Sequence, residues 1–526
     1  MQRGSRRGGI VAAGLASLAL VLAACSATPE PAPETTSEAP TTPESSAAPV
    51  PGGALVFGVT SDPDTLFPWK ATQFQAVAVL QTLYGTLTEF DKDLGVVPGL
   101  AESWDVSSDG LTLTLHLRTG VTFADGSTFD SADVVHSLQA IQDPATAAVS
   151  AASLGSVTAI EAPDANTVVL TLSAPDAALL ANLAVVNMAM LSSDDTEEGL
   201  SATPNGTGPF VLKDRTPNQS LTIARNDAYW GEPPVLDTVE FRVIPDESSI
   251  VSAMQSGNVQ MAVFNDPLVA QTAEAGGLKV EKTPQLSYHV LQLNARQGAL
   301  TDVNVRLAMQ CAIDRQQVLD TAALGEGEVT GPITSPAYKS DPNARPCPTR
   351  DLDKAKEYLA KAGHPEGVTI KTIVSQGEYS TSVNEAQNLQ AQLAEAGITL
   401  DLEVLESGAY VDRWIAADFE AAVALNGGRP DPDGMYVRYF TSTGNLNKVA
   451  GYSSDTLDQI FVEGRASSDP AVRTPIYEKI GRELEDNAAW IWLFTSFNYT
   501  ATGDGVTGFV PMANNSLQYL RTTSLS

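Results

Sequence analysis

Alternating hydrophobic and polar positions predict strands in the first half of the chain. From Leu111 to Leu117 every second residue is leucine and the residues between are polar, which indicates a half-buried strand. An apolar run at 53–60 and partly apolar runs at 239–244 and 259–264 predict further strands. A helix is expected at 247–256, between the last two runs, because Gly257 provides a stop signal.

Helical periodicity is prominent in the second half. Apolar residues recur at helical spacing over 305–313, 352–362 and 383–396, and a glycine follows each of the last two segments. The third segment runs directly into an alternating strand at 398–404. Because helices and strands alternate, the pattern predicts α/β lobes in which ligands bind at the carboxyl ends of strands.

The first 25 residues have the layout of an export signal. Three arginines precede an uncharged run from Gly8 to Ala24 that is rich in alanine, leucine and valine. The run is short for a membrane span, so an anchoring helix is the weaker alternative. Leu22-Ala23-Ala24 before Cys25 resembles a bacterial lipobox, which implies that Cys25 is acylated. The match of Ser5-Arg6-Arg7 to a twin-arginine signal is poor, which favours the general secretory route and leaves the other open.

Composition separates a tether from an acidic body. Residues 26–51 consist almost wholly of Pro, Thr, Ser, Ala and Glu, which predicts a disordered tether. The whole chain carries 31 Lys and Arg against 63 Asp and Glu, a net charge of -32. This charge excludes a broad phosphate-binding surface, so no nucleic-acid partner is expected. It also disfavours docking on anionic lipid, so the lipid anchor alone attaches the exported protein to the outer face of the cell membrane.

Catalytic and metal-binding motifs are lacking in the sequence. It has no Walker loop, H-E-x-x-H or G-x-S-x-G motif, and its four histidines are scattered without ligand spacing. We therefore predict no enzyme activity, no metal and no cofactor. A secreted hydrolase remains an alternative of another class, but no nucleophile can be nominated for it.

Two cysteines remain once Cys25 is assigned to lipid. In an exported protein, Cys311 and Cys347 are candidates for a disulfide, and the Pro-rich loop around Cys347 is able to reach a helix. The alternative is a pair of buried thiols.

Several collinear stretches resemble one protein family. These stretches are 98–135, 206–210 with 226–233, 255–260, 305–315 and 353–363. On them the chain resembles the extracellular solute-binding proteins of ABC importers, in the dipeptide/oligopeptide/nickel group called family 5. Gln260 stands where the family usually has Asp, and the resemblance runs in order from about Gly53 to the C-terminus.

The resemblance implies a fold and a function. The fold is α/β, a two-lobed periplasmic-binding-protein-like fold of type II with an extra subdomain inserted in the first lobe. The function is to capture a peptide-class solute between the lobes, as a monomer, and to deliver it to the transmembrane subunits of an ABC permease. The implied parts are the signal peptide (1–25), the tether (26–51), lobe I (52–88, 200–287 and 486–526), the inserted subdomain (89–199) and lobe II (288–485).

The ligand site departs from the pattern of the family it resembles. In peptide-binding members, an Asp before a Pro-containing loop holds the α-amino group of the peptide. Here Asp431-Pro432-Asp433 matches the loop, but Gly427-Gly428-Arg429 occupies the place of that Asp, and Ser375-Gln376-Gly377 replaces the Arg of the dipeptide binders. An oligosaccharide, bound through amides and aromatic faces, is therefore an alternative cargo. The candidate ligand-binding residues are Gln73, Phe74, Gln75, Tyr410, Trp414, Asn426, Gly427, Gly428, Arg429, Asp431 and Trp492.

Overall fold

Strand β18 (Trp490–Thr502) occupies the middle of the largest sheet in the computed structural model, which describes residues 52–376 and 381–526. The predicted signal peptide, the tether and Cys25 lie outside these residues. To one side of β18 the sheet continues through β11 (Met261–Phe264), β1 (Ala54–Val59), β10 (Thr238–Val243), β9 (Ser220–Arg225) and β8 (Phe210–Thr216). To the other side it continues through β13 (Tyr288–Leu293), β17 (Ala421–Asn426), β15 (Val368–Gln376) and β16 (Ile398–Glu406). We call the part built on the first group lobe I and the part built on the second group lobe II.

The chain crosses between the lobes at two adjacent places. Residues 490–496 of β18 pair with β13 and β14 (Gly327–Val329), whereas residues 497–502 pair with β12 (Lys279–Pro284) and β11. The second crossing is the short segment 285–287, which joins β12 to β13. β18 is thus shared by the two lobes, whereas the predicted boundaries place the whole strand in lobe I.

Three parallel strands form the centre of lobe I. β1 pairs in parallel with both β10 and β11, so their carboxyl ends meet at one edge of the sheet. Helix α5 (Glu247–Gln255) follows β10, and α6 (Pro267–Ala275) follows β11. The strands and the helix predicted over 239–264 are confirmed by β10, α5 and β11.

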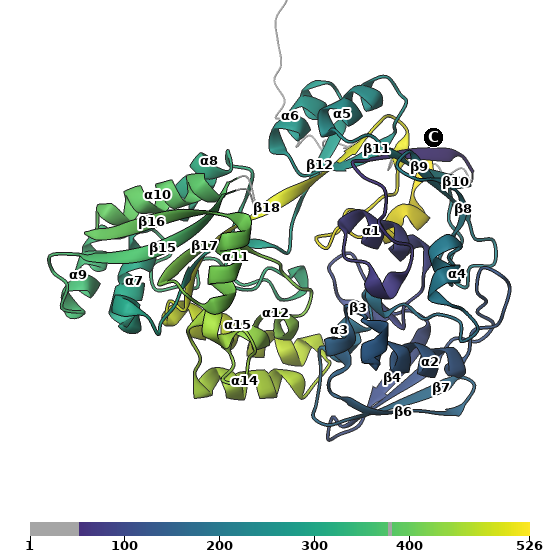
Figure 1. The fold of residues 1–526 in the computed structure, drawn as a ribbon, viewed down its shortest axis with the longest axis horizontal. Helices are drawn as coiled ribbons and strands as arrows, with labels where there is room; N and C mark the ends of the chain where they lie inside the picture. The colour runs from purple at the N-terminus through teal and green to yellow at the C-terminus, as the bar shows by residue number, and fades with distance from the viewer. Residues whose placement is uncertain (1–51, 377–380) are drawn as a thin grey trace, which may run out of the picture. The chain divides into compact units, whose positions relative to one another are not determined.

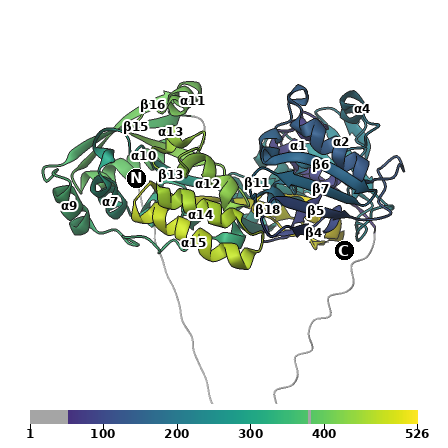
Figure 2. The same cartoon turned by 90° about the horizontal axis from the view of Figure 1, so that it is seen from below.

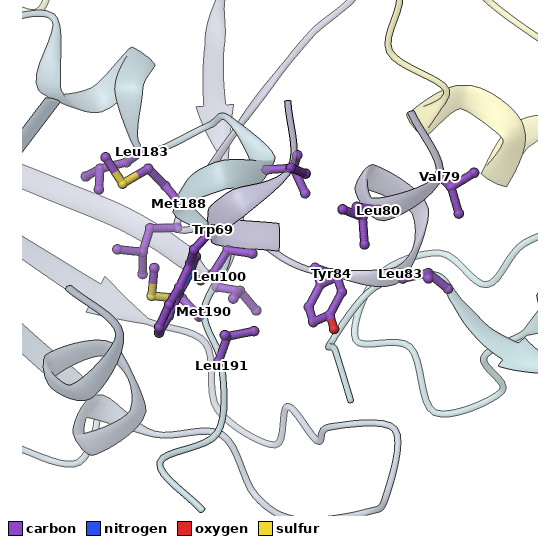
Figure 3. Packing of buried hydrophobic residues seen from close by; sticks show 14 of the residues in the cluster. Trp69, Val79, Leu80, Leu83, Tyr84, Leu100, Leu183, Met188, Met190 and Leu191 are labelled. Carbon is purple, nitrogen blue, oxygen red and sulfur yellow. Dashed lines mark hydrogen bonds between the residues drawn. The ribbon is translucent and has the colours of Figure 1, made fainter. Parts of the chain in front are cut away.

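The core of lobe I extends around α1 (Phe74–Leu83) and Trp69. Figure 3 shows the indole of Trp69 beside Met190 and Leu100, and Leu80 and Tyr84 on and just after α1. Trp69 is 4% exposed, and its indole nitrogen donates to the carbonyl of Ala189 at 2.9 Å. A buried tryptophan contributes most when its N–H has such a partner.

The inserted subdomain is a four-stranded antiparallel sheet. Its order is β4 (Ala101–Val106), β5 (Thr112–Leu117), β7 (Thr167–Leu172) and β6 (Val157–Asp164), and Figure 2 shows these strands side by side. The leucines of β5 are buried and alternate with half-buried residues, which confirms the predicted strand. Helix α2 (Ser131–Gln142) packs on β6 and begins at a capping box of Asp130 and Asp133. The shorter elements around it are β2 (Thr88–Phe90), β3 (Val96–Pro98), α3 (Leu179–Asn182) and α4 (Glu197–Ala202).

Lobe II has helices on both faces of its strands, as the alternating pattern predicts. One face packs against α7 (Val303–Ala312), α8 (Arg315–Ala322), α9 (Leu352–Lys361) and α10 (Ser382–Ala394), which Figure 1 shows beside β15 and β16. The other face packs against α11 (Ser407–Ala416) and α13 (Asn447–Ala450). Cys311 of α7 is bonded to Cys347, with their Cα atoms 5.0 Å apart. Closing a loop with a sequence separation of 36 stabilises the fold by roughly 4 kcal/mol in the chain-entropy model.

A third group of helices completes lobe II. It comprises α12 (Pro432–Phe440), α14 (Asp455–Arg465) and α15 (Pro470–Asp486), and Figure 2 shows α14 and α15 side by side. These helices cover Trp490 and Trp492 of β18, while Ile491 and Leu493 face the cluster formed with α7–α10. The first half of β18 is therefore buried on both faces. At the C-terminus, β19 (Val506–Thr507) pairs with β20 (Ser524–Leu525).

Candidate ligand-binding site

Two cavities border the crossings between the lobes. The first, which we call the arginine cavity, has a volume of about 320 Å³ and is lined by Arg429 of lobe II and by Arg521, Tyr229 and Trp230. The second, which we call the acidic cavity, has a volume of about 890 Å³. Gln285 of the crossing segment lines both cavities.

The arginine cavity contains one ion pair and one arginine without an ionic partner. Glu89 and Arg521 lie 3.0 Å apart, and Arg521 also donates to the hydroxyl of Tyr229 at 3.4 Å. Among the described residues Arg429 has neither an ion pair nor a hydrogen bond through its side chain. Desolvation lowers the pKa of Arg429, and the nearby positive charge of Arg438 lowers it further.

The acidic cavity lies at the carboxyl ends of parallel strands. Asp246 and Glu247 follow β10, and Asp266 follows β11; Glu326 of lobe II completes a set of four lining carboxylates, with no lysine or arginine in the lining. Both aspartates cap the helix that follows, by accepting from backbone N–H groups of α5 and α6. This position agrees with the expectation that ligands meet α/β lobes at strand ends.

Three leucines of the acidic cavity are exposed. Leu268 of α6 is 56% exposed, Leu324 after α8 is 55% exposed, and Leu425 of β17 is 39% exposed. They come from both lobes and face the same cavity, together with Phe497. A set of exposed apolar side chains in a hollow is typical of a ligand site.

Gly428 and Arg429 of the predicted set line the arginine cavity. A Cβ atom on Gly428 would lie 1.9 Å from the carbonyl oxygen of Leu286, so no larger residue fits without movement of the crossing segment. Gly427 is exposed, and a Cβ there would meet nothing within 4 Å. Because Gly428 packs closely against Leu286, the backbone position of the next residue, Arg429, is fixed.

Asn426 and Trp414 belong to a hydrogen-bonded chain and line neither cavity. The indole nitrogen of Trp414 donates to Gln292 at 2.7 Å, and Gln292 donates to Asn426 at 3.1 Å. Asn426 in turn donates to the hydroxyl of Tyr288 at 3.3 Å. Because the Asn426 amide is used in this way, the prediction that it meets the ligand does not fit its position.

Tyr410 and Trp492 are also corrected by their burial. Tyr410 is 6% exposed and donates to the carbonyl of Val423 at 2.9 Å, while Trp492 is fully buried and donates to Tyr436 at 3.0 Å. Neither lines the cavities. Asp431 caps α12 and forms a buried ion pair with Arg473 at 2.6 Å, so its carboxylate is not offered to a ligand.

The predicted glutamines at the start of α1 lie elsewhere. Gln73 is exposed at the N-cap, and Gln75 donates to Thr60 at 3.3 Å. Neither lines the arginine or the acidic cavity. Phe74 begins α1, but its side chain lies outside the described part.

A buried polar cluster beside the acidic cavity was missed by sequence reasoning. His289 of β13 contacts Glu385 of α10 through Nδ1 at 2.9 Å and the hydroxyl of Ser496 through Nε2 at 2.7 Å. The side chains of His289 and Glu385 are 3% and 0% exposed. The His289 ring stacks on the ring of Phe494, with the ring centroids 4.2 Å apart. These residues link β13, α10 and β18 next to the crossings, and their spacing in the sequence gives no signal of it.

Two features are absent from residues 52–376 and 381–526. No helix in these segments is long and apolar enough to cross a bilayer. No group of three or more His, Cys, Asp or Glu side chains in them is placed to hold a metal ion.

Comparison with known proteins identifies the fold and the family. The model for bacterial extracellular solute-binding proteins, family 5, matches residues 95–447. A probable di/tripeptide-binding protein of Pseudomonas aeruginosa is 30% identical over 464 residues, which cover 82% of this chain and 88% of the relative. The glutathione-binding protein GsiB of Escherichia coli K12 is 27% identical over 492 residues, or 88% of this chain and 93% of GsiB.

Solved structures agree with this comparison. HbpA2 of Haemophilus parasuis superposes with a TM-score of 0.82 at 25% identity, covering 90% of this chain and 100% of that chain. DppA of Helicobacter pylori in complex with the peptide STSA has a TM-score of 0.69 at 27% identity, covering 90% and 98%. The fold is therefore the two-lobed α/β fold of type II periplasmic binding proteins. The chain belongs to the bacterial extracellular solute-binding proteins, family 5.

Proposed function

We propose that this protein is the substrate-binding lipoprotein of an ABC importer and that it captures a peptide-class solute between its lobes. The observation that carries the proposal is that both cavities draw walls from both lobes, with Gln285 of the crossing segment in each. The relatives support the class of cargo, since one is named for di- and tripeptides and a similar structure holds a peptide.

Capture follows from the two crossings. In the described part of the chain, the backbone passes between the lobes only at residues 285–287 and in the middle of β18, so a change of backbone angles there rotates one lobe against the other. A solute that contacts both lobes binds the closed form more tightly and shifts the population toward it. The closed form then delivers the solute, unaltered, to the permease.

Attachment rests on the N-terminal segment. Acylation of Cys25 holds the protein on the outer face of the membrane, and the Pro-rich tether at 26–51 lets the acidic body move above it. We further propose that the protein is a monomer and that it has no enzyme activity, no cofactor and no nucleic-acid partner. In this proposal lobe I comprises 52–88, 200–287 and 486–526, and lobe II comprises 288–485. The inserted subdomain comprises 89–199, and β18 contributes to the parts of the sheet in both lobes.

An oligosaccharide is the second candidate cargo. Amides and aromatic rings, which recognise sugars without a charged terminus, also line the arginine cavity: Gln81, Asn187, Gln285, Asn514, Asn515, Gln518, Tyr229 and Trp230. A sugar would leave the charge of Arg429 without a counterion, which favours the peptide.

A ligand screen tests the proposal. The purified protein is heated with di- to pentapeptides and with β-linked oligosaccharides, and a ligand at about 100 times its Kd should add roughly 2.7 kcal/mol of stability. Small-angle scattering should show compaction with the same ligands. Stabilisation by sugars alone would replace the peptide with the oligosaccharide, and consumption of a ligand would overturn the binding-protein role.

A further inference from the structure

We propose that the inserted subdomain stabilises the open form of the protein, through a contact with lobe II that must separate when the lobes close on a solute. We call this contact the subdomain interface. It is formed around two small cavities by residues within 94–113 and 172–181 of the subdomain and by residues within 430–431 and 465–473 of lobe II. The inference rests on the proposed function and deepens it by assigning a regulatory role to the subdomain.

Three cavities follow one another from the crossing to the outer end of this interface. The arginine cavity, which is lined by Leu286 of the crossing segment, has a volume of about 320 Å³. The next has a volume of about 140 Å³ and shares Pro430 with the first, and the third has a volume of about 20 Å³ and shares Ser468 with the second. Since one water molecule needs about 10–15 Å³ of such space, the outer end of the subdomain interface is nearly shut.

The acidic cavity lies on the other face of the strands next to the crossing. His289 of β13 and Leu425 of β17 are paired, and both line the acidic cavity. Their neighbours Tyr288 and Ala424 pack instead in the cluster with α12, α14 and α15, because successive residues of a strand point to opposite faces. Figure 1 accordingly shows α6 and α8 on one side of β18 and α3 and α14 on the other. The side with the acidic cavity is the open one, with a volume of about 890 Å³.

A rotation about the crossings changes these two sides in opposite senses. The rotation axis lies near residues 285–287 and the middle of β18, where the chain passes between the lobes. Narrowing the acidic cavity therefore moves the loop between α14 and α15 away from the subdomain. The opposite rotation is blocked, because the outer end of the subdomain interface has no room left to close. The structure is thus at the open limit of the movement, and closure takes place on the side of the acidic cavity.

Apolar and charged groups both stabilise the subdomain interface. Ala177 and Leu180, which border both small cavities, are 7% and 6% exposed, and separating the interface exposes them to water. Asp176 of the subdomain acts on Arg465 of lobe II across the interface. Burial lowers the pKa of Arg465, but the charges of Asp433 and Asp176 outweigh burial and raise that pKa. Separating the two parts therefore costs free energy.

The subdomain interface thereby lowers the affinity for the solute. Binding selects the closed form, and any free energy that the interface gives to the open form makes the closed form rarer in the absence of solute. The apparent Kd rises by the same factor by which that population falls. A part of the chain that lies on the far side of the crossing thus sets how much solute is needed for closure.

Pulsed EPR on the full chain tests the opposite movements without any solute. Spin labels are attached to cysteines that replace Glu274 of α6 and Gln317 of α8, two exposed residues of different lobes. Ser468→Tyr places a ring where the small cavities leave too little room, so the distances between the labels should become shorter. The control Ser442→Tyr, at an exposed position of lobe II that lines neither small cavity, should leave them unchanged. Unchanged or longer distances in Ser468→Tyr, with a melting temperature near wild type, would overturn the proposal.

A cross-link tests the same interface in the other direction. Oxidation of Ala177→Cys/Ser468→Cys joins two residues that both border the small cavities and so keeps the subdomain interface shut. With the di- to pentapeptides of the ligand screen, the oxidised protein should bind roughly tenfold or more weakly than wild type and show no compaction in small-angle scattering. Mild reduction should restore both, because the native bond between Cys311 and Cys347 is buried. The single cysteine variants are the controls and should bind as wild type does.

Each outcome bears on the proposal separately from the proposed function. Ser468→Tyr should bind the same peptides roughly two- to tenfold more tightly than wild type, since it destabilises the open form. Wild-type affinity in the oxidised double-cysteine protein, or failure of the two cysteines to form a bond, would overturn the role of the subdomain while peptide binding stands. If no peptide binds wild type, the proposed function falls, whereas the label distances still decide whether the interface holds the lobes open.

Discussion

Arg473 donates two hydrogen bonds to Asp431, and both side chains are buried, at 4% and 7% exposure. The hydroxyl of Tyr477 donates to the same carboxylate at 3.1 Å. Asp431 also caps α12, so one carboxylate joins α12 to α15 and starts the helix that follows the Gly428-Arg429 loop. Asp431, in the loop that matches the family's peptide-binding loop, therefore has a structural role.

Removing Arg473 should destabilise lobe II strongly. Arg473→Met leaves Asp431 buried without its counterion, and losing one partner of a buried pair typically costs about 3–5 kcal/mol. Urea unfolding should report this loss as a lower midpoint. The double variant Asp431→Leu/Arg473→Met should recover part of it. As a control, Arg413→Gln breaks solvent-exposed ion pairs with Glu403 and Asp418 and should cost about 1 kcal/mol or less.

Gly428 and Gly427 provide a matched pair of substitutions. Gly428→Ala forces the new Cβ against the Leu286 carbonyl at the crossing and should cost roughly 1–3 kcal/mol, with weaker ligand binding as Arg429 is displaced. Gly427→Ala meets no atom within 4 Å and should leave unfolding and affinity near wild type. If the two substitutions changed the free energy of unfolding and the ligand affinity equally, in urea unfolding and in ligand titrations, the steric argument would be contradicted.

Trp414→Phe should separate packing from ligand recognition. It removes the N–H that donates to the fully buried Gln292, so the amide oxygen of Gln292 is left unpaired. The free energy of unfolding should therefore fall by about 1–3 kcal/mol. Ligand affinity, measured by calorimetry, should stay unchanged because Trp414 lines neither cavity. A tenfold loss of affinity at unchanged stability would return Trp414 to the site.

Asp433 should make stability depend on pH. Burial raises its pKa to about 6, and the charge and hydrogen bond of Arg465 only partly oppose that shift. Because the folded form binds this proton more tightly than the unfolded form, Asp433 favours folding most below about pH 4, and that contribution is lost as the pH rises to about 6.

Comparison with Asp433→Asn isolates this effect. The difference in unfolding free energy between wild type and Asp433→Asn should change by about 2–3 kcal/mol between pH 4 and pH 7, in the direction of lower wild-type stability at higher pH. Urea titrations at intervals of half a pH unit measure it. A constant difference across that range would show that the carboxylate titrates near its ordinary value.

Local periodicity predicted much of the scaffold. The alternation at Leu111–Leu117 and the stripes that became α9 and α10 depend on one buried face per element, which a sequence displays directly. Trp492 shows the limit of that logic. It was a candidate ligand-binding residue, but helices of two different clusters cover both faces of this central strand.

Sequence reasoning nominated ligand residues chiefly where a loop could be compared with a family pattern. Gly428 and Arg429 of that loop line a cavity, and their contact with a ligand stays a prediction. Asp246 and Asp266 each lie two residues after a predicted strand and cap a helix in the structure, but neither feature alone distinguishes a binding residue. The tertiary fold alone brings together Glu89, Tyr229 and Arg521, since Glu89 and Arg521 are 432 positions apart in the sequence.

The placement of β18 also bears on how the chain matures. Residues 490–502 supply an interior strand to both halves of the sheet, yet they follow in the sequence every strand with which they pair. A nascent polypeptide that has not reached them lacks the strand that joins β13 to β11, so neither half is able to complete its hydrogen-bond ladder early. Such an order of synthesis means that the two halves of the sheet are completed together, by the same strand.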